Sequence, residues 1–244
     1  MQSFTKKIAL LSIFSIAMGF METAVVVYLR KIYYPAGFDF PLIPISSDIA
    51  LIEFYREAST IIMLLGIGII AGRTISQRFA FFIYCFAIWD IFYYVFLKIS
   101  IDWPQSFFTW DILFLIPVPW VGPVLAPIII SLTMIIFTLC ILYMQEKGHA
   151  VRINVKEWIL LCLGSIIIIF SFMLDYLKYV GSGNSAQHIW SLSSEEPLFK
   201  EISNYIPTHY NWWLFSLGEG VIVGAVLIFM KRIRNGKKEI DTRS

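Results

Sequence analysis

The sequence predicts an all-α membrane protein: a bundle of six transmembrane helices, with both chain ends cytoplasmic and a short interfacial or re-entrant segment around 103–120. Three observations predict this fold. The 244 residues are 58% hydrophobic and only 15% charged, whereas a soluble domain is about one quarter charged. Six apolar runs are long enough to cross a bilayer. The basic residues are divided unequally between the two sides of these runs.

A membrane span needs roughly 20 apolar residues, because each residue adds about 1.5 Å to a helix. The first run follows two lysines like a signal peptide, but no clear A-x-A site ends it, so we expect it to persist as a helix. The spans belong to one transmembrane domain, 1–231, and a basic cytoplasmic tail follows at 232–244. The expected spans cover about 8–29, 48–71, 79–99, 122–145, 157–179 and 211–231.

The basic residues predict the orientation, because positive charge concentrates on the cytoplasmic side of membrane proteins. With the N-terminus inside, 13 basic residues lie on the inner side and five on the outer side. The inner residues are Lys6, Lys7, Arg73, Arg78, Lys147, Arg152, Lys156, Lys231, Arg232, Arg234, Lys237, Lys238 and Arg243. The outer residues are Arg30, Lys31, Lys98, Lys178 and Lys200. We expect Arg30 and Lys31, at a span end, to reach the lipid headgroups.

The predicted outer side also collects tryptophans, in excess of a simple interfacial belt, which indicates a structured cap. Residues 103–120 follow Asp102, as at a helix start, and contain closely spaced prolines. This pattern predicts a short interfacial or re-entrant helix followed by extended chain. Residues 180–210 form an outer polar loop, in which 195–202 has the pattern of a short amphipathic helix. The tryptophans are Trp103, Trp110, Trp120, Trp190, Trp212 and Trp213.

Ionisable residues lie inside the expected spans, although such groups are costly in a bilayer. Every acid among them lies at or outside the predicted midplane, and Asp111 in the tryptophan-rich segment can join the group. Asp48 and Glu157 begin their spans and are interpreted as helix caps. The ionisable residues within the spans are Glu22, Glu53, Arg56, Glu57, Asp90, Asp175 and Glu219.

Spacing along the second span brings charged groups together. Glu53 and Glu57 are four residues apart and share a helix face, and Arg56 can pair with Glu53. Asp90 lies near the middle of the third span. We expect Glu53, Glu57 and Asp90 to form the centre of a polar cavity, which Glu22 and Glu219 complete and whose charge Arg56 tunes.

One arginine cannot neutralise all these acids. Their carboxyl groups can be protonated, bind a cation, face water or bridge helices by hydrogen bonds. A divalent cation is the cofactor that oxygen-rich groups of this kind would hold, and the pattern does not identify the metal. The histidines lie in loops without a metal motif, and the three cysteines lie in apolar runs without a C-x-x-C pair.

Three functions remain open from the sequence. The first is a cation- or proton-handling transporter with an outward-facing acidic site. The second is a membrane-embedded enzyme that acts on a lipid from the outer leaflet; carboxylates would serve as acid and base, and an apolar groove would lead to them. The third is a non-catalytic membrane subunit or assembly factor. The expected partners are the bilayer and either a small cation or a lipid, without nucleic acid. The expected location is the plasma (inner) membrane.

Overall fold

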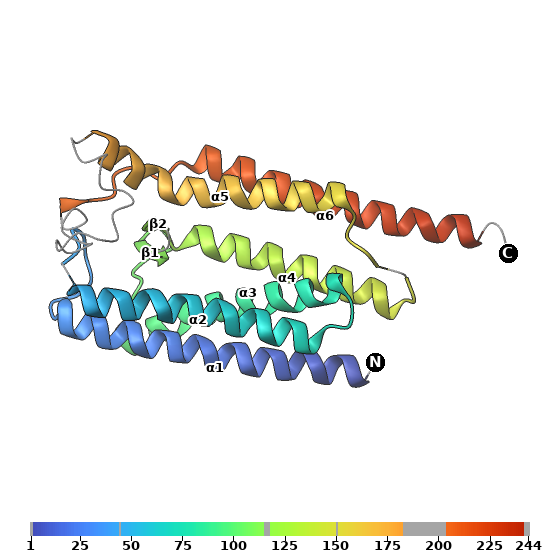
Figure 1. Ribbon diagram of the computed structural model, residues 1–244, viewed down its shortest axis with the longest axis horizontal. Helices are drawn as coiled ribbons and strands as arrows, with labels where there is room; N and C mark the ends of the chain where they lie inside the picture. Colours follow the sequence, from blue (N-terminus) through green and yellow to red (C-terminus); the bar gives the residue numbers. More distant parts are fainter. Residues whose placement is uncertain (1, 44, 115–117, 150, 183–203, 242–244) are drawn as a thin grey trace.

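A computed structural model describes residues 2–43, 45–114, 118–149, 151–182 and 204–241. In these residues the protein forms six long helices and one β-hairpin (Figure 1). Each of the six helices is long and apolar enough to cross a bilayer. The protein is therefore a multi-pass membrane protein in contact with lipid, and the predicted six-helix bundle is confirmed. The elements are α1 (Gln2–Tyr33), α2 (Ser47–Ala71), α3 (Ile75–Ile101), β1 (Trp110–Phe114), β2 (Trp120–Pro123), α4 (Leu125–Glu146), α5 (Val155–Ser182) and α6 (Trp212–Asp241).

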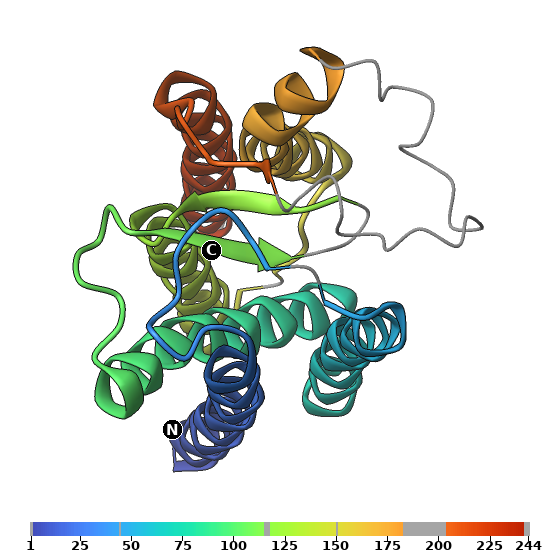
Figure 2. The same cartoon turned by 90° about the vertical axis from the view of Figure 1, so that its left-hand side faces the viewer.

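The helices run roughly side by side along one long axis (Figure 1). Helix α1 begins and helix α6 ends at the same end of the bundle, here called the terminal end (Figure 1). The hairpin lies toward the opposite end, here called the hairpin end. Helix α3 packs against α1, α2 and α4, whereas α5 packs mainly against α6 and β2. The view along the bundle shows α5 and α6 on one side of the hairpin and α1, α2 and α3 on the other (Figure 2).

Two glycines let α5 and α6 approach closely. A Cβ atom on Gly164 would lie 2.8 Å from the Gly218 carbonyl oxygen, and one on Gly218 would lie 2.9 Å from the Gly164 carbonyl oxygen. Side chains at these positions would collide with the facing backbone, so the close pair depends on both glycines. Gly220, two residues further along α6, has no such neighbour within 4 Å.

The start of α5 confirms the interpretation of Glu157 as a cap. The Glu157 backbone N–H donates to Asn154 Oδ1 at 2.9 Å, and the Asn154 N–H donates to Glu157 Oε2 at 2.8 Å. This reciprocal pair is a capping box, which satisfies two backbone N–H groups that the helix leaves free. Arg232 of α6 then donates from Nε and Nη2 to the two Glu157 oxygens, each at 2.8 Å. The carboxylate therefore anchors α6 as well.

The described residues of the segment, 103–114 and 118–120, are not helical, and the expected short helix is not found among them. Asp102 ends α3 in the left-handed conformation at φ 53°, which Asp tolerates better than most residues. Strands β1 and β2 then pair antiparallel, with Asp111 opposite Gly122 and Ile112 opposite Val121. Strand pairing satisfies the backbone groups that a helix would otherwise have satisfied. Gly122 has no side chain because a Cβ there would lie 2.7 Å from the Phe172 ring.

The hairpin reaches into the bundle. The ring of Phe114 in β1 lies 6.4 Å from the ring centres of both Phe86 and Trp89 on α3. Phe86 is 15 residues from Ile101, the last residue of α3, or about 22 Å along the helix. The side chain of Phe114 therefore packs beside the middle of α3, well inside the bundle. The polar stretch that includes the expected amphipathic helix 195–202, His188 and Trp190 lies outside the described residues.

Candidate functional site

A cavity of about 740 Å³ lies between the helices and below the hairpin. Residues from all six helices and both strands line it. Along α3 the lining extends from Phe79 to Tyr94, or roughly 22 Å of helix. The cavity is therefore elongated along the bundle, and its volume lies within the range of about 300–1,000 Å³ that is usual for small-molecule sites.

The two ends of this cavity differ in chemistry. Toward the terminal end it is lined by apolar side chains, among them Phe79, Phe82, Phe137 and Leu161. Its charged side chains all lie nearer the hairpin end, among aromatic and apolar ones, and they are Glu22, Arg56, Glu57, Asp90 and Glu219. Glu219 lies about 10 Å and Asp90 about 16 Å from the hairpin ends of their helices. The cavity is thus amphipathic along its length.

The cavity reaches the surface of the bundle between α2 and α5. Ile62 of α2 and Ser165 of α5 both line it, and both are exposed, Ile62 to 67%. Ile62 is nine residues from Ala71, about 14 Å, and Ser165 is ten residues from Val155, about 15 Å. Both measures start at the terminal end, so the two residues lie at the same depth. In a hydrocarbon core about 30 Å thick, that depth faces lipid.

The predicted centre of three acids is divided in the structure. Arg56 binds Glu22 of α1 and, through Nε at 2.7 Å, Glu53 of its own helix. Glu53 is buried in this ion-pair cluster and does not line the cavity, whereas Glu57 is buried and does line it. Arg56 thereby joins α1 to α2, and its charge is shared between two carboxylates.

Helix α4 supplies hydroxyl groups to two other acids. Ser131 donates to Asp90 Oδ2 of α3 at 2.8 Å, and Thr133 donates to Glu219 of α6. Ser131 and Thr133 are two residues apart, so their side chains leave α4 in nearly opposite directions, about 160° apart around the helix axis. Each hydroxyl therefore holds a carboxylate at one margin of the α4 face that lines the cavity.

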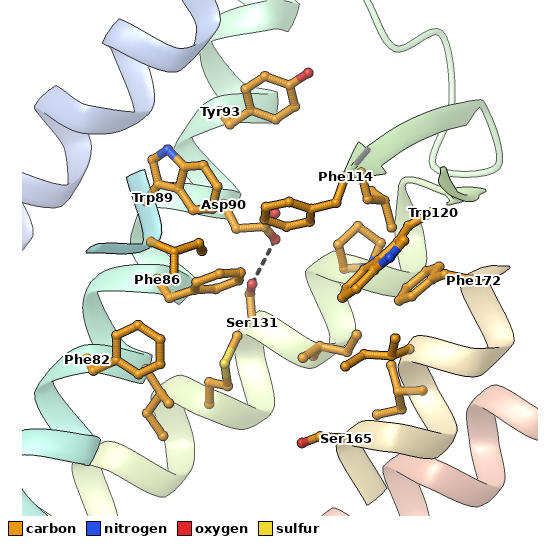
Figure 3. A pocket seen from close by; sticks show the side chains of 18 of the residues that line it. Phe82, Phe86, Trp89, Asp90, Tyr93, Phe114, Trp120, Ser131, Ser165 and Phe172 are labelled. Carbon is orange, nitrogen blue, oxygen red and sulfur yellow. Dashed lines mark hydrogen bonds between the residues drawn. The ribbon is translucent and has the colours of Figure 1, made fainter. Parts of the chain in front are cut away.

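Aromatic rings surround Asp90 (Figure 3). Phe86 and Trp89 of α3 lie 5.2 Å apart between ring centres, and Phe114 and Trp120 of the hairpin lie 5.3 Å apart. Phe114 also lies 6.4 Å from the ring centres of Phe86 and Trp89, so the four rings form one continuous cluster. Asp90 is only partly buried, because its carboxylate borders the cavity.

Asp111 lies in β1 and does not line the cavity. It is 1% exposed and accepts a hydrogen bond from Arg30 Nη2 at 3.1 Å. Burial raises the pKa of the Asp111 carboxyl, and the Arg30 charge opposes that shift. The expectation that Arg30 reaches lipid headgroups is wrong, since its side chain is buried against Asp111 and the ring of Trp103. This buried ion pair fastens the hairpin to α1.

Asp175 belongs to a different place, at the hairpin end of α5. It accepts a hydrogen bond from the Tyr205 hydroxyl at 2.7 Å and from the Thr208 backbone N–H at 3.2 Å. Burial and the neighbouring Asp175 raise the pKa of Tyr205. These contacts tie the chain before α6 to α5. His209 borders the same small hollow.

The described residues contain no group of three or more His, Cys, Asp or Glu side chains placed to hold a metal ion. The acids face separate partners, namely Arg56, Ser131, Thr133, Arg30 and Tyr205. Comparison with protein-family models, with curated proteins and with solved structures gives no match.

Several residues that shape the cavity were not expected from the sequence. Ser131 and Thr133 lie in the fourth span, which has no ionisable residue, and Ile62 and Ser165 mark the opening. A hydroxyl in an otherwise apolar span is a usable sign, because such groups often bond to a neighbouring helix. Nothing in the local sequence distinguishes Ile62 from other isoleucines on α2.

Proposed function

We propose that this protein binds a lipid-like molecule, which enters from the bilayer between α2 and α5 and places its polar group among the carboxylates at the hairpin end. The observation that carries this proposal is the lipid-level opening of an amphipathic cavity. Ile62 and Ser165 border that opening at one depth. The apolar part of the cavity suits a hydrocarbon chain, because burial of apolar surface stabilises the bound molecule.

The shape of the cavity favours a lipid-like molecule over a free cation. An apolar groove leading to acids is what a lipid substrate requires, and the cavity runs along α3 from Phe79 for roughly 16 Å to Asp90. A divalent cation needs about six oxygen ligands that converge. The acids instead have separate partners, and Arg56 already binds Glu22 and Glu53. Proton or cation transport therefore has weaker support.

Photo-cross-linking tests this proposal in proteoliposomes that contain a phospholipid with a diazirine on its acyl chain. Phe137 is 3% exposed and lines the cavity, whereas its neighbour Ile136 is 58% exposed and does not line it. Lipid outside the bundle should label Ile136 whether or not an acyl chain enters the cavity. We expect Phe137 to be labelled as well, because the chain enters the cavity. Labelling of Ile136 without Phe137 contradicts the proposal.

Two tryptophan substitutions test the opening. Ile62→Trp places an indole at the opening, and Ile70→Trp places the same group on α2 at an exposed position that does not line the cavity. We expect the first variant to lose most labelling at Phe137 and to keep labelling at Ile136. The second variant should match the wild-type protein at both positions. Equal effects of the two substitutions would exclude entrance between α2 and α5.

A further inference from the structure

We infer that the polar group of the bound molecule is a positively charged amine, held by Asp90 and Glu219 among the aromatic rings of α3 and the hairpin. This inference rests on the proposed lipid-binding function and specifies the chemical class of the ligand. It follows from the balance of charge in the cavity, from the rings around Asp90 and from groups in the lining that lack a partner.

The cavity lining carries more negative than positive groups. Four carboxyl residues line it, Glu22, Glu57, Asp90 and Glu219, and Arg56 is the one basic residue among the described residues that does so. Arg56 is already bound to Glu22 and to Glu53, which lies outside the lining. An anionic headgroup would meet these carboxylates without a free cation, and a positively charged group would complement them.

The rings around Asp90 suit the same charge. Phe86, Trp89, Phe114 and Trp120 form a continuous cluster beside the carboxylate (Figure 3). The face of an aromatic ring attracts a cation, and quaternary and protonated amines are bound in this way by aromatic residues. A carboxylate beside several rings thus offers both a counter-charge and ring faces to one ammonium group.

Polar atoms in the lining remain open to a ligand. Glu219 accepts a hydrogen bond from Thr133, and its buried Oε2 atom has no hydrogen-bond partner within the described part of the chain. Trp89 is 7% exposed, and its indole N–H likewise has no partner there. Leaving a buried polar group without a partner is costly, and a bound ligand can satisfy such a group. The Glu219 oxygen can accept a hydrogen bond from an ammonium group.

Competition by matched C18 molecules tests the inference in the same photo-cross-linking assay. Octadecylamine, octadecanol and stearate share one chain length and differ in the charge of the polar group. Each is added to neutral phosphatidylcholine proteoliposomes, and the mole fraction that halves labelling of Phe137 is measured. We expect octadecylamine to compete at a mole fraction at least about tenfold lower than octadecanol, with stearate the weakest.

Carboxamide variants identify the groups responsible. Asp90→Asn and Glu219→Gln keep side-chain size and remove charge, and we expect each to erase most of the preference for the amine while octadecanol competes as before. Asp175→Asn is the matched control, because Asp175 does not line the cavity. Equal competition by the three molecules, or strongest competition by stearate, overturns the amine and leaves lipid binding standing. Absence of labelling at Phe137 refutes the lipid-binding function itself.

Discussion

The guanidinium of Arg30 lies 3.8 Å from the centre of the Trp103 ring while it donates to Asp111 at 3.1 Å. The Phe38 ring contacts the same guanidinium at 4.3 Å. Arg30 is thus held by an opposite charge and by aromatic rings, an environment that favours a planar, delocalised cation over an ammonium group. Because Asp111 lies in β1, this contact joins α1 to the hairpin that lines the cavity.

Arg30→Met should destabilise the protein by about 3 kcal/mol or more, because it leaves the Asp111 carboxylate buried without its counter-charge. Arg30→Lys should fall between this variant and the wild type, since lysine keeps the charge and loses the planar contact with Trp103. Denaturation in mixed micelles with increasing dodecyl sulfate measures both. Lys98→Met breaks the exposed pair with Asp102 and should cost under about 1 kcal/mol. An Arg30 effect no larger than the Lys98 effect would show that the pair contributes little.

Gly218→Ala should destabilise the protein by about 1–3 kcal/mol, because the added methyl group collides with the Gly164 carbonyl oxygen. Gly220→Ala is the matched control on the same helix. Its added methyl group has no neighbour within 4 Å, and alanine favours a helix by up to about 1 kcal/mol over glycine. Thermal unfolding in detergent should therefore give shifts of opposite sign for the two variants. Shifts of the same sign and size would refute the close α5–α6 contact.

Glu157→Ala should cost about 2 kcal/mol, because it removes one half of the capping box with Asn154 and both hydrogen bonds from Arg232. Lys156→Ala changes the neighbouring exposed residue and should alter the free energy of unfolding by less than about 0.5 kcal/mol. Both values can be measured by the same micelle denaturation. Equal stability of the two variants would argue against the anchoring role of Glu157.

The predicted orientation can be tested with single cysteines at exposed positions of opposite ends. Gln105→Cys lies toward the hairpin end and Lys147→Cys at the other end. With the N-terminus inside, a membrane-impermeant maleimide added to intact cells should label the first variant and spare the second. The natural cysteines lie within α3, α4 and α5, so the wild-type protein should give the background signal. The reverse pattern of labelling would invert the topology.

Local pattern was enough to predict the contacts that lie within one helix. Arg56 pairs with Glu53 three residues away, as helical spacing predicts, and Glu157 takes part in the cap of its helix. Contacts between helices could not be predicted in this way. Arg30 and Asp111 are 81 residues apart, and Asp90 and Ser131 are 41 residues apart. Their pairing depends on which helices pack together and on how each is rotated.

The sequence alone determined that six apolar helices are long enough to cross a bilayer, because transfer of a long apolar helix into lipid depends on local composition. It also placed the intramembrane acids toward one end, and Glu22, Glu57, Asp90 and Glu219 do line one cavity near that end. Only the tertiary structure decided that Glu53 is outside the cavity lining, that Trp110–Phe114 pairs with Trp120–Pro123 and that the cavity opens beside Ile62. These outcomes depend on packing between distant segments, which no single stretch of the chain encodes.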